Sequence, residues 1–180
     1  LNILSSKSVI YSCSASFLIC SISVVQAVKL NNCGIQDRAS GAVVEVLNPK
    51  PGSMVLDVCA APGTKVNYIS DYLNGEGEIY ASDIDPIRMK MGVSRSECLS
   101  LNVNWSIKNA TKDFYLKSDY IIVDAPCSGT GVLGKKLDIR WRRKKSEIKL
   151  FASLQLKILK NISKYLKNDG ILVYATCSME

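Results

Sequence analysis

Residues 54–65 read Met-Val-Leu-Asp-Val-Cys-Ala-Ala-Pro-Gly-Thr-Lys, and this stretch decides the fold. The run 54–58 is short and largely apolar, as is typical of a buried strand in a parallel sheet. A turn of small side chains follows, and then a helical pattern as far as Leu73. Gly63 lets the backbone approach a ligand closely because it has no side chain, and the unpaired N–H groups of the helix start face the same turn. The stretch therefore predicts a strand, a cofactor-binding loop and a helix.

Strands and helices alternate along the rest of the chain. The sequence predicts further strands at residues 78–82, 104–108, 120–123 and 171–175, and helices at 40–47, 86–101 and 146–166. We expect Pro86 in the first turn of its helix and Gly170 near the end of the last helix. Such alternation predicts an α/β fold with helices on both faces of one parallel sheet, ordered 3-2-1-4-5 when strands are numbered from residue 54.

An acidic residue stands where the second of these strands ends. Asp83 follows Gly63 by twenty positions, where doubly wound folds place a carboxylate that accepts from ribose hydroxyls. Neither the G-x-G-x-x-G pattern nor the P-loop pattern occurs, so binding of a dinucleotide or a nucleoside triphosphate is disfavoured. The alternative interpretation of the loop alone is a tight turn followed by an acidic strand end.

Two cysteine motifs follow two neighbouring strands of the predicted sheet. Residues 124–129 read Asp-Ala-Pro-Cys-Ser-Gly, and residues 175–178 read Ala-Thr-Cys-Ser. Open α/β sheets bind their ligands at the carboxyl ends of the strands, so we expect Cys127 and Cys177 to face one cofactor. Two such thiols indicate covalent chemistry followed by a separate release step. The alternative is that each cysteine is a small buried apolar residue, the common role of a single cysteine.

Composition narrows the classes of function. The 180 residues contain no histidine, which excludes Ser-His-Asp triads, Cys-His pairs and histidine metal sites. The seven cysteines include no C-x-x-C pair, so we expect no metal site and a reducing, cytoplasmic location. A net charge of +7 favours a polyanionic partner such as nucleic acid, although a merely soluble basic protein has the same charge.

Taken together, these motifs resemble the Sun/RsmB-type family of RNA (cytosine-5) methyltransferases over residues 34–180. The resemblance implies a Rossmann-like class I methyltransferase core that uses S-adenosylmethionine. A complete core of this kind has two more strands, so we expect the domain 34–180 to be incomplete at its carboxyl end. The implied cofactor contacts are Cys59, Ala60, Ala61, Pro62, Gly63, Thr64, Lys65, Asp83, Asn109 and Asp124.

The resemblance also implies roles for the residues of the reaction. Cys177 would be the nucleophile that adds to carbon-6 of the cytosine, and Cys127 would assist release of the product. Asp124 would hold the amino edge of the base, with Lys65 positioning it. The chain departs from the family at two places: Asn109 stands where relatives usually have an acidic residue, and Thr64 where many have a second glycine. The first departure puts the contact near the adenine or its ribose in doubt.

A basic segment follows the Cys127 motif. Eight basic residues lie between positions 135 and 149, against two acidic ones. Because Lys and Arg at this density can contact phosphates, we expect RNA contacts from Arg140, Arg142, Arg143 and Lys144. Trp141 is interpreted equally as a stacking surface or as a core residue. The target cytosine must leave any base stack, and ribosomal RNA is the first expectation for the substrate, with transfer RNA the second.

Residues 1–33 match the family poorly. The stretch 9–28 has no charges, yet its serines dilute the hydrophobicity, so a membrane span and a signal peptide are minor interpretations. Partial alternation of apolar residues and serines predicts a β-hairpin there. Two other functions remain open: a non-catalytic RNA-binding module on the same fold, and a DNA cytosine-5 methyltransferase, in which the nucleophile would be the cysteine of the Pro-Cys motif. The sequence leaves the oligomeric state open.

Overall fold

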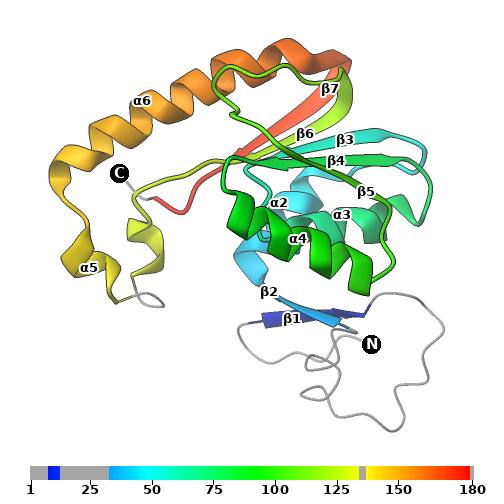
Figure 1. The fold of residues 1–180 in the computed structure, drawn as a ribbon, viewed down its shortest axis with the longest axis horizontal. Coiled ribbons are helices and arrows are strands. Elements are labelled where there is room, and N and C mark those ends of the chain that lie inside the picture. Colours follow the sequence, from blue (N-terminus) through cyan, green and yellow to red (C-terminus); the bar gives the residue numbers. More distant parts are fainter. Residues whose placement is uncertain (1–7, 13–32, 134–136, 179–180) are drawn as a thin grey trace, which may run out of the picture.

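A five-stranded parallel sheet forms the centre of the fold (Figure 1). The computed structural model describes residues 8–12, 33–133 and 137–178. The sheet has the order β5-β4-β3-β6-β7. Its strands are β3 (Met54–Val58), β4 (Glu78–Asp83), β5 (Val103–Ile107), β6 (Ser118–Asp124) and β7 (Leu166–Ala175). Numbered from β3, this is 3-2-1-4-5, so the predicted order and the α/β class are confirmed.

Helices cover both faces of the sheet. Figure 1 shows α2 (Arg38–Leu47), α3 (Thr64–Leu73) and α4 (Pro86–Cys98) on one face and α6 (Lys145–Ile162) on the other. Three short elements complete the fold: the 3-10 helices η1 (Thr130–Val132) and η2 (Ser163–Tyr165) and the helix α5 (Ile139–Arg142). Because all strands of the sheet are parallel, their carboxyl ends lie at the same edge, where the site residues gather.

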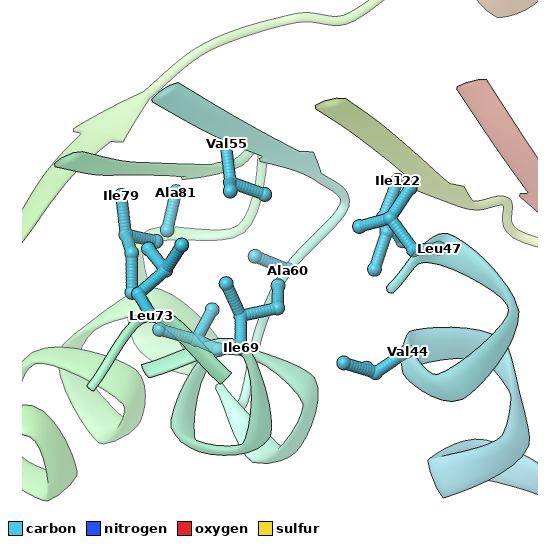
Figure 2. Close-up of a cluster of buried hydrophobic side chains, with 10 residues drawn as sticks. Val44, Leu47, Val55, Ala60, Ile69, Leu73, Ile79, Ala81 and Ile122 are labelled. Atoms are coloured by element: carbon cyan, nitrogen blue, oxygen red, sulfur yellow. The ribbon is translucent and has the colours of Figure 1, made fainter. Parts of the chain in front are cut away.

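Each face of the sheet has its own apolar core. Alternate residues of a strand point to opposite faces, so Val55 and Ile122 pack against α2 and α3, whereas Leu56 and Ile121 face α6. Figure 2 shows the first cluster, with Leu47 of α2 and Ile69 of α3 directed at the sheet. These side chains are almost fully buried. The two clusters hold α3 and α6 against opposite faces of the sheet, and so also position the loops that follow β3 and β6.

Asp85 explains the start of α4. Its carboxylate accepts hydrogen bonds from the backbone N–H groups of Ile87 (2.8 Å) and Arg88 (3.1 Å), which is the usual N-cap arrangement. Pro86 occupies the first turn as predicted, because its missing N–H would have no partner there. The helix ends at Cys98, three residues earlier than expected.

The connection between α6 and β7 differs from the prediction. The helix ends at Ile162 instead of residue 166, and the strand begins at Leu166 instead of residue 171. Gly170, predicted to end the helix, lies inside β7 at an irregularity where the pairing jumps from Ser118↔Leu166 to Tyr120↔Ile171. A Cβ on Gly170 would lie 2.8 Å from the carbonyl oxygen of Asp119, so the glycine is needed for close approach of two strands.

The amino-terminal part forms a second, smaller sheet. β1 (Ser8–Ser12) pairs antiparallel with β2 (Cys33–Asp37), and Figure 1 shows this pair below the helices α2 and α4. Residues 13–32, which hold most of the predicted hairpin, lie outside the described residues. In the part of the chain that the structure describes, no helix combines the length and apolar character needed to cross a membrane.

Candidate active site

The loop after β3 folds tightly around Gly63. This residue has φ of 93°, a left-handed conformation that glycine adopts without steric cost. A Cβ there would lie 3.2 Å from the indole of Trp105 and 3.3 Å from the Cα of Gly92. Gly63 is also the N-cap of α3 and supplies no side-chain cap. The first N–H groups of α3 therefore point towards the loop without a side-chain acceptor at their cap.

Asp83 is tied directly to this loop. Its side chain is 4% exposed, its Oδ2 accepts from the N–H of Ala61 at 3.1 Å, and its Oδ1 accepts from the N–H of Asp85 at 3.0 Å. The guanidinium of Arg88 lies 3.9 Å from Oδ2 and also donates to the carbonyl of Ala61. Ala61 is thus held at both its N–H and its carbonyl, so the loop is fixed before any ligand arrives.

Lys65 and Asp124 join the loop to the end of β6. The ammonium of Lys65 forms an ion pair with Oδ2 of Asp124. The Lys65 side chain is only 12% exposed, whereas that of Asp124 is 37% exposed. The carboxylate therefore keeps a face towards solvent, where it can accept a further hydrogen bond. Two residues predicted from separate motifs are brought together here.

Beneath this pair lies a carboxyl that the motifs did not identify. Asp57, in the last part of β3, has no exposed surface, and neither of its oxygens has a hydrogen-bond partner. Burial raises its pKa to about 8; Lys65 opposes the rise, whereas the charges of Asp124 and Asp83 add to it. A single charged residue in an otherwise apolar strand was the available sequence signal.

Asn109 closes a turn after β5. Its side-chain oxygen accepts from the N–H of Thr111 at 3.0 Å and from the Thr111 hydroxyl at 2.7 Å. Its own N–H donates to the carboxylate of Asp113 at 2.7 Å. Asn109 therefore stabilises the turn in which it lies. It is half-buried, and the adjacent Ala110 is buried.

The two cysteine motifs lie side by side, as predicted. The Sγ atoms of Cys127 and Cys177 are 2.8 Å apart, and both cysteines are free thiols. Ser128 and Ser178, one residue further along each motif, have their hydroxyl oxygens 2.8 Å apart. The N–H of Gly131 donates to the carbonyl of Cys177 at 2.8 Å. The two loops are thus bonded to each other at successive positions beyond the end of the sheet.

The two thiols bind their protons with different strength. Loss of water alone would raise the pKa of Cys127, but hydrogen bonds from Cys177, Ser178 and Thr176 outweigh it and lower that pKa. The pKa of Cys177 rises to about 11, first because of lost water and then because of its bond to Cys127. Cys127 is therefore the more acidic thiol of the pair when no substrate is present.

Cys59, the third cysteine at this edge, has a different environment. Burial raises its pKa to about 12, and the nearby charges of Asp83, Asp57 and Asp124 add to that rise. A thiol this weakly acidic stays protonated near neutral pH. Cys59 therefore packs beside the loop and is unsuited to act as a nucleophile there.

The basic segment lies on and before the start of α6. Trp141 is 86% exposed, so it is a surface residue and not part of the core. Arg142 forms a surface ion pair with Asp138 at 3.0 Å, and Arg140 and Lys144 are exposed. Arg143 differs from its neighbours, because its Nε donates to the carbonyl of Ser128 at 3.1 Å.

Taken together, the loop, the acidic side chains and Lys65 fit S-adenosylmethionine. The uncapped start of α3 suits a carboxylate. Asp83 and Asp124 add two carboxylates at this loop, and carboxylates accept hydrogen bonds from hydroxyls and attract a positive charge. The absence of a side chain on Gly63 lets the indole of Trp105 and the Cα of Gly92 pack against the loop. Arg88 and Gln155, which hold loop carbonyls in place, were missed in the sequence because such contacts follow no short motif.

Comparisons with known proteins agree with this geometry. Residues 44–180 match the family model described as 16S rRNA methyltransferase RsmB/F. The chain is 38% identical over 151 residues to the ribosomal RNA small subunit methyltransferase B of Photorhabdus laumondii, and 35% identical over 151 residues to the probable enzyme of that name in Bacillus subtilis. Each match covers 81% of this chain and 34% of the relative. The chain thus spans about a third of the length of these curated relatives.

A solved structure supports the same conclusion. The crystal structure of NSun6 from Pyrococcus horikoshii with SFG superposes with a TM-score of 0.79 at 31% identity, covering 89% of this chain and 42% of that one. This similarity agrees with the predicted class I methyltransferase fold. Because the family model matches most of the chain, the chain belongs to the RsmB/F family of S-adenosylmethionine-dependent RNA cytosine-5 methyltransferases.

Proposed function

We propose that this chain is the catalytic part of an enzyme that methylates carbon-5 of a cytosine in ribosomal RNA, in the cytoplasm. One observation carries the proposal: the thiols of Cys127 and Cys177 lie 2.8 Å apart at the edge of the sheet where Lys65 pairs with Asp124. A structural cysteine pair would not require an ion pair and a tight glycine loop beside it. The relatives from Photorhabdus laumondii and Bacillus subtilis, which are named as ribosomal RNA small subunit methyltransferases B, support small-subunit ribosomal RNA as the substrate.

Cys177 starts the reaction by adding to the base. Carbon-5 of cytosine is a poor nucleophile, and addition of the Cys177 thiolate to carbon-6 makes carbon-5 resemble an enamine carbon. S-adenosylmethionine, when bound, supplies an electrophilic methyl group. Asp124 holds the amino edge of the cytosine, and the ion pair with Lys65 orients that carboxylate. Since the pKa of Cys177 is about 11, its proton must be removed as the base enters the site.

Release follows from the second thiol. A proton acceptor removes the proton from carbon-5 of the cytosine. The bond between carbon-6 and Sγ of Cys177 then breaks, and Cys177 leaves as a thiolate. Cys127 serves this step as the proton acceptor, because its lowered pKa leaves a larger fraction of it as thiolate near neutral pH. The contact between the sulfurs also gives a route by which the proton taken up by Cys127 can pass to the departing Cys177 thiolate.

The basic segment supplies the contact to RNA. Arg140, Arg142 and Lys144 are exposed and are proposed to contact phosphates, with Trp141 as a surface on which a base stacks. Arg143 is considered separately below. The expected substrate region is single-stranded or opened RNA, because the cytosine must enter between two thiols.

The test traps the covalent intermediate. The full-length protein with Cys127→Ala is incubated with unmodified small-subunit ribosomal RNA and S-adenosylmethionine, and a denaturation-resistant protein–RNA band is sought. We expect a band with Cys127→Ala and none when Cys177→Ala is added. Cys98→Ala is the matched control, because this exposed cysteine at the end of α4 should leave turnover unchanged.

Each outcome separates the alternatives. Trapping by Cys177→Ala in place of Cys127→Ala would assign the nucleophile to the Pro-Cys motif and contradict the proposal. A band with transfer RNA and none with ribosomal RNA would change the substrate. If no RNA gives a band but S-adenosylmethionine binds, the chain is a binding module rather than a catalyst.

A further inference from the structure

The loop that carries Cys127 is gripped on both sides by side chains from the α6 region. Gln155 Nε2 donates to the carbonyl of Pro126 at 2.9 Å, and Arg143 Nε donates to the carbonyl of Ser128 at 3.1 Å. These carbonyls belong to the residues directly before and after Cys127. Two hydrogen bonds from one helix region therefore restrict the backbone on either side of the thiol.

Both gripping side chains are themselves held in place. The hydroxyl of Tyr174 donates to Oε1 of Gln155 at 2.9 Å, which directs the amide nitrogen of Gln155 towards Pro126. The guanidinium of Arg143 lies 4.9 Å from the ring centre of Phe151 and 3.7 Å from a carboxylate oxygen of Glu147. Side chains restrained in this way lose little further entropy when they bind the loop.

Cys127 needs this support more than Cys177 does. The pairing between β6 and β7 ends at Asp124↔Ala175, and the last backbone bond of that ladder runs from the N–H of Ala125 to the carbonyl of Ala175 at 3.1 Å. Beyond it, the Cys127 loop contacts the Cys177 loop through Ser128 and Gly131. Those bonds join two loops to each other, whereas Gln155 joins the Cys127 loop to α6 and Arg143 joins it to the turn between α5 and α6.

We propose that Gln155 and Arg143 are positioning residues for Cys127, and that they set the rate at which the covalent intermediate is resolved. This inference rests on the proposed function. It also gives Arg143 a role different from that of its basic neighbours, which face solvent. Misplacing a reacting group by about 1 Å can cost on the order of a hundredfold in rate, so loosening the loop should slow release far more than addition.

The experiment uses two conservative changes in the full-length protein. Gln155→Glu keeps the shape of the side chain but replaces the donor with an acceptor. Arg143→Lys keeps the charge but removes the Nε donor and the planar group over Phe151. Lys157→Arg is the matched control, because Lys157 is an exposed basic residue of α6, two positions from Gln155, and has no role in the proposed site.

Single-turnover time courses with RNA then separate addition from release. We expect the adduct to persist about ten- to a hundredfold longer in Gln155→Glu and Arg143→Lys. Its formation rate should change less than twofold, and the salt dependence of RNA binding should stay as in wild type. Tyr174→Phe should give a smaller delay of the same kind. Wild-type adduct lifetimes in both main variants would overturn the inference.

A second readout does not depend on the proposed function. Phenylarsine oxide condenses with two neighbouring thiols to form two As–S bonds and one water, so it binds tightly only where the sulfurs are close. Wild-type protein should bind it through Cys127 and Cys177, with Cys127→Ala as the blank. We expect at least tenfold weaker binding in Gln155→Glu and Arg143→Lys, and unchanged binding in Lys157→Arg. Wild-type binding in both main variants would refute the positioning role even if no RNA substrate were found.

Discussion

At the scale of single residues, Cys127 and Cys177 have pKa values shifted in opposite directions although their sulfurs are in contact. Hydrogen bonds donated to its sulfur lower the pKa of Cys127, whereas burial, and after it the neighbouring Cys127, raise the pKa of Cys177. A nucleophile that stays protonated at rest is protected from adventitious reagents, since the thiolate is the reactive form. If Cys177 is the nucleophile, as proposed, the pair keeps it unreactive until a substrate arrives.

Replacing Cys127 should make Cys177 more acidic. Cys127→Ser keeps the size and polarity of the side chain but removes an ionisable neighbour, so the pKa of Cys177 should fall from about 11 towards its ordinary value. The rate of Cys177 alkylation by iodoacetamide, followed by mass spectrometry between pH 7 and 11, should reach its midpoint at a lower pH in the variant. An unchanged midpoint would mean that lost water alone sets the pKa of Cys177.

Asp57 should couple stability to pH. Its pKa is about 8 in the folded chain and about 3.9 in an unfolded one, so the folded state binds more protons between these values. The free energy of unfolding should therefore fall as pH rises from about 5 to 8, by up to about 1.4 kcal/mol per pH unit, and level off above 8. Denaturant unfolding of wild type and Asp57→Asn across this range should show the slope only in wild type. Equal slopes in both proteins would exclude Asp57 as its source.

Motifs predicted which residues the structure brings together at the site better than they predicted the residues that hold the loops in place. Cys127, Cys177, Lys65 and Asp124 stand in short patterns at strand ends, and the structure brings them together. Arg88 and Gln155 act through backbone carbonyls 27 and 29 positions away in the chain. Any long polar side chain can make such a bond, so only the folded geometry identifies the residue that does.

At the scale of elements, one aromatic side chain links β5 to the cofactor loop. Trp105 lies against Gly92 of α4 and beneath Gly63, and its Nε1 donates to the hydroxyl of Ser96 at 3.0 Å. A Cβ on Gly92 would come within 2.4 Å of the indole ring. The spacing between α4 and the sheet therefore depends on a residue without a side chain.

Gly92→Ala should destabilise the fold and disturb the loop. The indole must shift towards Gly63, and overpacking of this kind costs about 1–3 kcal/mol. Trp105→Phe removes ring atoms at the point of collision, so the double variant should recover part of the loss in a double-mutant cycle. Strictly additive losses in the free energy of unfolding would show that Gly92 and Trp105 do not collide. Affinity for S-adenosylmethionine, measured by calorimetry, should fall in the single variant Gly92→Ala.

Element order was easier to predict than element ends. Apolar runs and helical periodicity placed all five strands of the parallel sheet, because burial on both faces demands such runs. The end of α6 and the start of β7 were wrong, because Asp169 adopts a left-handed φ of 63° and the register with β6 shifts there. Gly170 fits a helix end and a strand irregularity equally well in sequence.

At the scale of the whole molecule, positive charge and thiols share one edge. The exposed basic residues before α6 follow the Cys127 loop, and Arg143 bonds to that loop directly. A phosphate backbone held by this segment would therefore approach the carboxyl ends of β6 and β7. The net charge of +7 predicted nucleic acid, but only the fold shows where that charge is placed relative to the thiols.

Neutralising this edge should weaken RNA binding and flatten its salt dependence. The triple change Arg140→Gln, Arg142→Gln and Lys144→Gln should lower the salt slope by about 2, since each lost phosphate contact with single-stranded RNA contributes about 0.7. The control replaces Lys50, Lys117 and Lys164 by Gln, because these residues precede the amino ends of β3, β6 and β7. Equal effects of the two triple variants would mean that RNA responds to net charge alone.

The spacing of the two thiols also has a consequence for folding. Cys127 and Cys177 are 50 positions apart, so their contact forms only after β7 has paired beside β6, and contacts of long sequence separation form slowly. A newly made or refolding chain thus has seven separate thiols before it has this neighbouring pair. A reagent that requires both sulfurs at once would act as a clock, reporting the moment at which the last strand of the sheet is in place.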